Sequence, residues 1–278
     1  MNALEKRAIA SLASVYAMRM LGLFMVLPVF ALLGSELSGA TPALTGLAIG
    51  AYGLTQALLQ VPFGLLSDRL GRKPLIYVGL VIFAAGSLLA GASDSIYGVI
   101  AGRALQGAGA IASVLMALLS DLTREEQRTK AMATVGITIG LSFSLSLIVG
   151  PLVASVAGLA GLFYFTALLA TIALGIVRFL VPEPVAGALT SDHLPVRAML
   201  GRVLTDSRLL RLDFGIFALH LVLTALFLLV PVLLTQELGL PAERHWWFYL
   251  TIMVTSFFAM VPFIIIGEKY RKMKPVLS

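Results

Sequence analysis

Long apolar runs alternate with short polar connections along almost the whole chain, and this pattern limits what the chain can fold into. A helix that crosses a bilayer needs about 20 consecutive, mostly apolar residues. Only 12% of the 278 residues are charged, whereas a soluble domain carries about 25%. The pattern therefore predicts an all-α membrane protein. The expected spans are 12–34, 44–66, 74–92, 96–119, 131–154, 160–181, 212–234 and 246–267.

The basic residues indicate which ends of the spans face the cytoplasm. Lysines and arginines cluster before the first span, in the second, fourth and sixth connections, and after the eighth span. The odd-numbered connections carry mostly acids and a single base, Arg244. By the positive-inside rule, the N-terminus, the even-numbered connections and the C-terminal end are cytoplasmic. Topology thus explains the net charge of +6, so anionic lipids, not nucleic acid, are the expected partners.

The residue types needed for most enzymatic chemistry are missing from the sequence. There is no cysteine, the three histidines are far apart, and no HExxH or Walker-type string occurs. We therefore expect no enzyme, no metal and no cofactor. Any work that the protein performs would draw its energy from an ion or solute gradient, with the proton gradient as the expected source.

A regular cluster of charges lies in the connection between the second and third spans. Its glycine permits a tight turn, and its proline suits the first turn of the following helix. The string reads Gly64-Leu65-Leu66-Ser67-Asp68-Arg69-Leu70-Gly71-Arg72-Lys73-Pro74. It resembles the loop 2–3 signature of the major facilitator superfamily, whose members are secondary transporters built from two six-helix bundles.

This resemblance implies a mechanical role for the charged connection. In the family, its acid and bases hold the two bundles together on the cytoplasmic side in one state and separate in the other. The alternative is a cluster of charges that only orients the protein in the membrane. Asp121, at the foot of the fourth span, is the expected partner of Arg72. The expected gate residues are Gly64, Asp68, Arg69, Gly71, Arg72, Lys73 and Asp121.

An internal repeat indicates two related halves. Val61-Pro62-Phe63 in the second span matches Val261-Pro262-Phe263 in the eighth, and the charges that follow also correspond. The two triplets stand 200 residues apart. A repeat of this period fits one six-helix bundle plus a linker. The chain therefore resembles a transporter that is truncated after its eighth helix.

The repeat divides the chain into three parts. Residues 1–183 are expected to form a complete six-helix bundle, and 212–278 the first two helices of a second, incomplete bundle. The linker between them, 184–211, has apolar residues at helical spacing with arginines off that stripe. This pattern indicates an amphipathic helix on the inner leaflet, and an ordinary solvated linker is the alternative.

The fourth span carries an arginine that needs an explanation. A charge inside a membrane span costs at least about 2.5–3.5 kcal/mol and is tolerated toward a bundle interior or a wet cavity. Arg103 with Gln106-Gly107 resembles the superfamily's fourth-helix motif, in which the arginine is tied to proton coupling. The resemblance implies that role for Arg103, and the alternative is a side chain that snorkels to the outer surface.

The fifth span resembles the motif that marks the family's antiporters. Gly140 and the pair Gly150-Pro151 match it, whereas Ser146 stands where a glycine is expected. The Gly-Pro pair removes a backbone hydrogen bond and allows a kink where helices pack closely. The resemblance implies antiport, and the alternative is that these small residues only pack.

Polar side chains within the spans are the candidates for binding a substrate. Tyr52 and Gln56 stand four residues apart on one helix face, and Arg19 adds a charge in the first span. Any one polar side chain could instead make a single hydrogen bond between helices. The expected substrate-binding residues are Tyr16, Arg19, Tyr52, Gln56, Gln106, Ser142 and Ser146.

No Asp or Glu lies in the middle of an expected span. This absence favours a neutral, zwitterionic or anionic substrate over a lipophilic cation. His220, in the seventh span, could exchange protons because its reference pKa is near 6.5, or it could be buried and neutral.

Span by span, the chain resembles the drug:proton antiporter branch of the superfamily, and within it the YajR-type bacterial inner-membrane proteins. The resemblance implies a monomer that exports a small solute or drug by alternating access, in exchange for protons. Two alternatives stay open. One is a proton symporter or facilitator for a small metabolite such as a sugar, and the other is a membrane fragment that does not transport.

Overall fold

The computed structural model describes residues 1–183, 201 and 205–269, although not the side chains of 243, 257 and 260–269. The described chain is helical with no β-strand, and an isolated bridge joins Ser38 to Ser95. An all-α membrane fold is therefore confirmed. The main helices are α1 (Ala3–Met25), α2 (Leu27–Leu33), α3 (Pro42–Leu70), α4 (Arg72–Gly91), α5 (Ile96–Ala108), α6 (Ala112–Asp121), α7 (Glu125–Phe179), α9 (Ser207–Gln236) and α10 (His245–Lys269).

The helices account for the expected spans once α7 is divided. Six helical stretches of the described chain are long and apolar enough to cross a membrane. One of them, α7, has 55 residues, which corresponds to about 80 Å of helix against a hydrocarbon core of about 30 Å. Gly158 breaks it with a φ of 64° and a ψ of −166°, so α7 contains two spans. With α10, the described chain has helices at all eight expected positions.

Two of the spans are divided into two helices, the first past its middle and the fourth at its centre. The first span divides into α1 and α2 at Val26, because Pro28 has no N–H to donate to the preceding turn. The fourth divides into α5 and α6 at Gly109, where ψ is 50°. The prediction of one continuous helix over 96–119 was therefore wrong at its centre.

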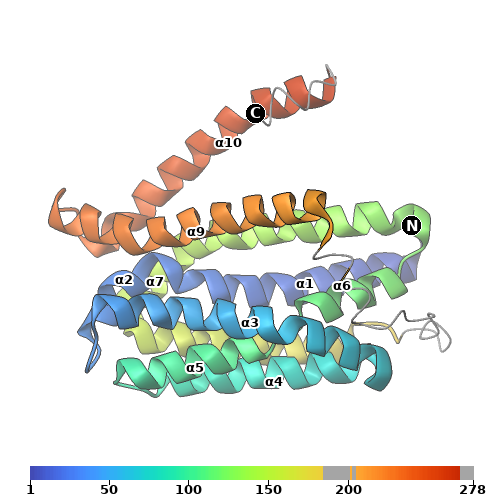
Figure 1. The fold of residues 1–278 in the computed structure, drawn as a ribbon, viewed down its shortest axis with the longest axis horizontal. Coiled ribbons are helices and arrows are strands. Elements are labelled where there is room, and N and C mark those ends of the chain that lie inside the picture. Colours follow the sequence, from blue (N-terminus) through green and yellow to red (C-terminus); the bar gives the residue numbers. More distant parts are fainter. Residues whose placement is uncertain (184–200, 202–204, 270–278) are drawn as a thin grey trace.

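The N-terminus and the described parts of the second, fourth and sixth connections gather at one end of the molecule. Figure 1 shows α1, α3, α4, α5 and α9 running roughly parallel across the view, while α10 diverges from them after its start. The N-terminus, the turn between α3 and α4, and the beginning of α9 lie at the right-hand end of the view. This placement agrees with the alternation of charge along the sequence.

Close packing of α5 against α3 and α4 depends on glycine. A Cβ atom added to Gly107 would lie 2.2 Å from the backbone oxygen of Tyr52 in α3, and one added to Gly86 would lie 2.4 Å from the backbone nitrogen of Gln106. Both of these neighbouring atoms belong to the backbone and cannot rotate away, unlike the Thr55 hydroxyl, which would lie 2.1 Å from the Cβ on Gly107. These two glycines therefore set the distance between the helices.

We expect Gly107→Ala to destabilise the protein by about 1–3 kcal/mol, because the new methyl group forces α5 away from α3. Gly140→Ala is the matched control, since nothing lies within 4 Å of its added Cβ and alanine is a better helix former than glycine. Thermal unfolding of both variants in detergent measures the difference. Equal melting temperatures of the two variants would show that α5 and α3 can move apart at Gly107 without loss of stability.

The start of the predicted second bundle packs on the first. Aromatic rings connect them: Phe143 of α7 lies 5.1 Å from Phe24 and 5.9 Å from Phe227 of α9, and Phe227 lies 6.4 Å from Tyr249 of α10, between ring centroids. Asp206 caps α9, which therefore begins five residues before the expected span at 212. The amphipathic helix predicted in 184–211 lies mostly outside the described residues.

Candidate functional site

Arg19 lies half-way along the first span, Ala3–Glu36, and only 1% of it is exposed. Its Nη2 donates to the Tyr52 hydroxyl at 3.0 Å, to Oε1 of Gln56 at 3.0 Å and to the Gly109 carbonyl at 3.3 Å. The acceptors come from α3 and from the break between α5 and α6. The predicted cluster of Arg19, Tyr52 and Gln56 is thus brought together.

Arg103 begins a second buried polar chain next to the first. Its Nε donates to the Ala48 carbonyl at 3.4 Å, and its Nη1 donates to Oε1 of Gln106 at 3.0 Å. Gln106 in turn donates from Nε2 to the Ser87 hydroxyl at 2.7 Å. Only 1% of Arg103 is exposed, so its side chain points into the bundle and does not snorkel outward. Its role in proton coupling stays a prediction.

Tyr52 joins the two arginines. The Arg103 guanidinium lies over the Tyr52 ring, 4.9 Å from its centroid, while Arg19 donates to the hydroxyl of the same side chain. The acidic residues of the described chain stand at helix ends or within the first or last two turns of a helix. Two guanidinium groups therefore share the interior of the bundle with no acid there to neutralise them.

The other predicted binding residues make their hydrogen bonds outside this cluster, although Tyr16 lies close enough to Arg19 and Tyr52 to interact with them electrostatically. Tyr16 is buried and donates its hydroxyl to the Ala112 carbonyl at 2.8 Å. Ser142 and Ser146 are buried but bond to carbonyls of their own helix, at 2.8 and 2.6 Å. His220 is exposed, and its Nδ1 lies 2.8 Å from the Ile216 carbonyl. The structure does not bring His220 to the arginines.

The glycines of the predicted antiporter motif have different surroundings. A Cβ on Gly150 would lie 2.6 Å from the Met25 carbonyl, so α7 packs closely on the end of α1 there. Gly140 has open space around it. Pro151 lies buried inside α7, which continues as a helix to Gly158.

Three of the predicted gate residues form a compact charged cluster at the turn between α3 and α4 and the end of α6. Arg72 pairs with Asp68 and donates from Nε to Oδ2 of Asp121 at 3.1 Å. It also donates to the Ser67 hydroxyl at 2.7 Å. The contact expected between Arg72 and Asp121 is therefore present. Gly71 makes the turn with a φ of 95°.

Not all of the charged connection belongs to this cluster. Lys73 is buried and donates to the Val181 carbonyl and to Oε1 of Glu183, both at 2.7 Å. Arg69 is exposed. A Cβ on Gly64 would make ordinary contact with Ser113, at 3.5 Å. Lys73 therefore binds the end of α7 and does not join Asp68 and Arg72. Its position in the sequence, next to Arg72, does not reveal this.

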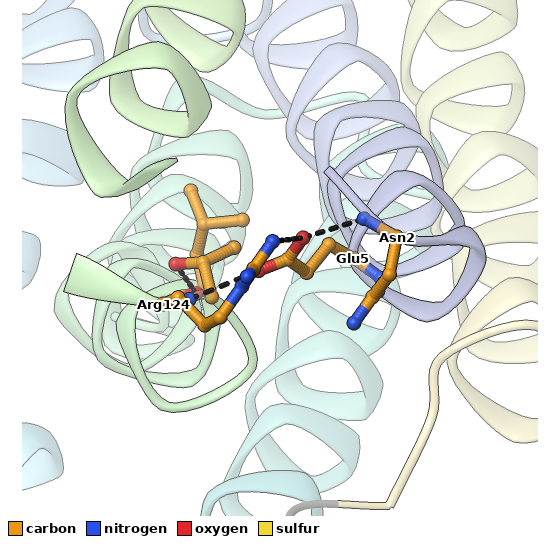
Figure 2. Close-up of polar contacts among 5 residues, drawn as sticks. Asn2, Glu5 and Arg124 are labelled. Carbon is orange, nitrogen blue, oxygen red and sulfur yellow. Dashed lines mark hydrogen bonds and ion pairs between the residues drawn. The ribbon is translucent and has the colours of Figure 1, made fainter. Parts of the chain in front are cut away.

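A further ion pair fixes the N-terminus to the turn between α6 and α7. Glu5 is buried, accepts from the backbone of Asn2 at 2.7 Å and receives Nε of Arg124 at 2.8 Å (Figure 2). Its carboxylate raises the pKa of the Arg124 guanidinium, so both partners stay charged. Asn2 and Glu5 also form a capping box, whose three-residue spacing is a signal that our sequence reading missed.

We expect Glu5→Gln to lower the thermal stability of the protein, because Arg124 and the backbone of Asn2 lose an ionised acceptor. Glu126→Gln is the matched control, since that side chain is exposed two residues away from Arg124. Limited proteolysis at the N-terminus, together with the melting temperature, checks the result. Identical digestion and melting of the two variants would contradict a structural role for this pair.

A separate apolar cavity of about 570 Å³ lies between α7, α9 and α10. Its residues are Phe143, Leu147, Leu223, Leu226, Phe227, Val230, Phe248, Tyr249, Ile252, Met253 and Ser256. Its lining fits an apolar group, whereas the arginine cluster fits a negatively charged group.

Comparison with known proteins agrees with this architecture. Residues 12–277 match the family model described as Major Facilitator Superfamily. The chain is 51% identical over 272 residues to the inner membrane transport protein YajR of Escherichia coli, covering 98% of this chain and 60% of that protein. The chain thus spans about 60% of the length of this relative.

Two further matches are more distant. The chain is 28% identical over 271 residues to the multidrug resistance protein MdtH of Aeromonas salmonicida, covering 91% of this chain and 63% of that protein. It superposes on a bacterial homologue of the human lysosomal transporter Spinster, in an inward-facing and unoccupied conformation, with a TM-score of 0.77 at 14% identity. That match covers 97% of this chain and 64% of the other.

Proposed function

Because this chain belongs to the Major Facilitator Superfamily, we propose that it is the larger part of a proton-coupled exporter of small solutes in the bacterial inner membrane. Membership makes it a transporter and not an enzyme. The name of the YajR relative supports the inner membrane, and that of the MdtH relative supports drug efflux. Coupling to protons and the direction of transport are our proposal.

The observation that carries the proposal is the pair of buried arginines around Tyr52. A membrane interior rejects a fixed charge, yet Arg19 and Arg103 are both 1% exposed. A permanent positive charge beside the transport path disfavours protonation of neighbouring groups and attracts anions. Movement of a proton or a substrate past Arg103 therefore changes the energy of the site, which is the requirement for coupling.

The charged cluster at the cytoplasmic end supplies the conformational part of the mechanism. Superfamily transport proceeds by rocking of one bundle against the other around a central site. Arg72, Asp68 and Asp121 connect α3, α4 and α6, so a movement of the second bundle against this face would alter their contacts. Alternating access then follows from making and breaking this cluster, with no ATP required.

The experiment that tests this function is flux in proteoliposomes. The natural protein that contains these 278 residues is reconstituted with a pH-sensitive dye inside, and candidate solutes are added under an imposed pH gradient. We expect solute movement to drive protons in the opposite direction, and a protonophore to abolish concentrative transport. Proton movement in the same direction as the solute would establish symport, and solute flux indifferent to the gradient would refute coupling.

We further propose that the N-terminus and the even-numbered connections are cytoplasmic. The sequence contains no cysteine, so single cysteines report exposure directly. Ala92→Cys, in the exposed turn between α4 and α5, should react with a membrane-impermeant maleimide in intact cells. Thr129→Cys, exposed at the start of α7, should react only after permeabilisation. The opposite pattern would reverse the orientation.

A further inference from the structure

The break in the fourth span places a helix N-terminus in the middle of the membrane. Gly109 lies half-way along Ile96–Asp121, and α6 begins at Ala112 with no side-chain cap. The first N–H groups of a helix have no partner within the helix, and they form the positive end of its dipole. Interrupted helices in transporters present such ends to anionic groups of substrates.

Arg19 faces this break with most of its donors unused. Its Nη2 reaches the Gly109 carbonyl, but Nε and Nη1 are buried and have no hydrogen-bond partner among the described residues. A guanidinium group has five N–H donors, and these two nitrogens carry three of them. Buried donors are almost always satisfied, so the site lacks an acceptor.

No acid of the described chain supplies that acceptor. Glu5 is engaged by Arg124, and Asp68 and Asp121 are engaged by Arg72 at the cytoplasmic end. The remaining described carboxylates also lie toward helix ends. At the break, Arg19 therefore meets the carbonyl end of α5 through Gly109, and no carboxylate among the described residues pairs with its remaining donors.

We propose that the break between α5 and α6, with Arg19, is a subsite for a carboxylate group of a small organic substrate. A carboxylate is planar and pairs with the flat guanidinium fork through two hydrogen bonds. Gln56 is half-buried and marks the side from which the group reaches Arg19. That this carboxylate takes part in transport rests on the proposed function. That it binds at Arg19 does not depend on that function.

The test is equilibrium dialysis of the purified chain, in chloride-free buffer, against labelled benzoate and benzamide. The two probes have the same shape and differ in charge. We expect saturable binding of benzoate and at least about tenfold weaker binding of benzamide, the factor that corresponds to about 1.4 kcal/mol. Equal binding of the two probes, or displacement of benzoate by an equal concentration of chloride, would overturn the carboxylate site.

Three variants locate the binding. Arg19→Gln should abolish benzoate binding, and Arg178→Gln, which removes an exposed arginine at the end of α7, should leave it unchanged. Gln56→Glu keeps the guanidinium and supplies an internal carboxylate in place of an acceptor that already lies 3.0 Å from Nη2. It should abolish benzoate binding and raise the melting temperature, so the test does not depend on the folding of Arg19→Gln.

Unchanged benzoate binding in Gln56→Glu would overturn the assignment to Arg19. The proposed function fails separately: benzoate binding without proton-coupled flux refutes only coupled transport. Coupled flux of neutral solutes by a protein that does not bind benzoate refutes only this subsite.

Discussion

Replacing Arg103 by alanine is expected to abolish transport driven by a pH gradient while the protein still reaches the membrane. The guanidinium is buried, donates to Ala48 and Gln106, and lies over the Tyr52 ring. Alanine removes the fixed charge to which we assign the coupling of the site to protons. Insertion should survive, because an apolar side chain enters the membrane more readily than arginine and Gly107 still packs against α3.

Arg103→Lys separates charge from geometry. Lysine keeps the positive charge but loses the planar fork that reaches two acceptors in different directions. We expect it to retain part of the pH-driven flux. Arg178→Ala, at an exposed position, should transport normally. Flux is measured together with membrane abundance, and full pH-driven flux in Arg103→Ala would show that the buried arginine has only a structural role.

The positions of the spans could be predicted because hydrophobic length is a local property. Each helix must satisfy its own backbone in lipid, so about 20 apolar residues suffice to identify it. The break at Gly109 was missed because glycine is also common in continuous membrane helices, where it allows close packing. The glycines at 102, 107 and 109 look alike in the sequence, yet the first two pack within α5 and the third ends it.

The polar cluster was partly predictable for a similar reason. The four-residue spacing of Tyr52 and Gln56 places them on one helix face, and an arginine in a span must find an interior partner. The carbonyl of Gly109, which Arg19 also contacts, could not be foreseen because it becomes available only where the helix breaks.

Contacts between distant segments were the least predictable part. Lys73 was grouped with the gate because of its place in the charged string, but it bonds to Val181 and Glu183, more than 100 residues away. Arg7 likewise donates to the carbonyls of Phe179 and Leu180. Both bases satisfy carbonyls at the end of α7, which favours cations through its dipole. Only the packing of α1 and α4 against α7 brings them there.

The contacts of Lys73 and Arg7 with the end of α7 and the Glu5–Arg124 ion pair have a common structural effect. They connect the beginning of α1, the turn after α3, the turn after α6 and the end of α7 at one end of the bundle. Contacts of this kind between helix ends favour movement of the bundle as one body, which the proposed mechanism needs. Rocking between two bundles requires such rigidity, since flexible helices would absorb the motion.

Asp68→Asn is expected to slow transport by about tenfold or more without preventing insertion. Asp68 and Asp121 both hold Arg72, and the side chains of Asp68 and Arg72 are only 23% and 13% exposed. A hydrogen bond to a charged group contributes about 1.5–3 kcal/mol, and about 1.4 kcal/mol corresponds to a factor of ten. If the pair forms in only one of the two transport states, its loss shifts their populations by that factor.

Glu183→Gln is the matched control for this prediction, because it also removes an acid that is paired with a base of the same charged connection. Glu183 is 78% exposed in its pair with Lys73, and exposed pairs contribute only about 0–1 kcal/mol. We therefore expect its transport rate to stay near that of the unmodified protein. Initial rates per molecule in the membrane, compared between the two variants, decide the matter. Normal transport by Asp68→Asn would leave the charged connection with no role beyond orienting the chain, because a contact that gates the protein cannot be lost without changing how often it opens.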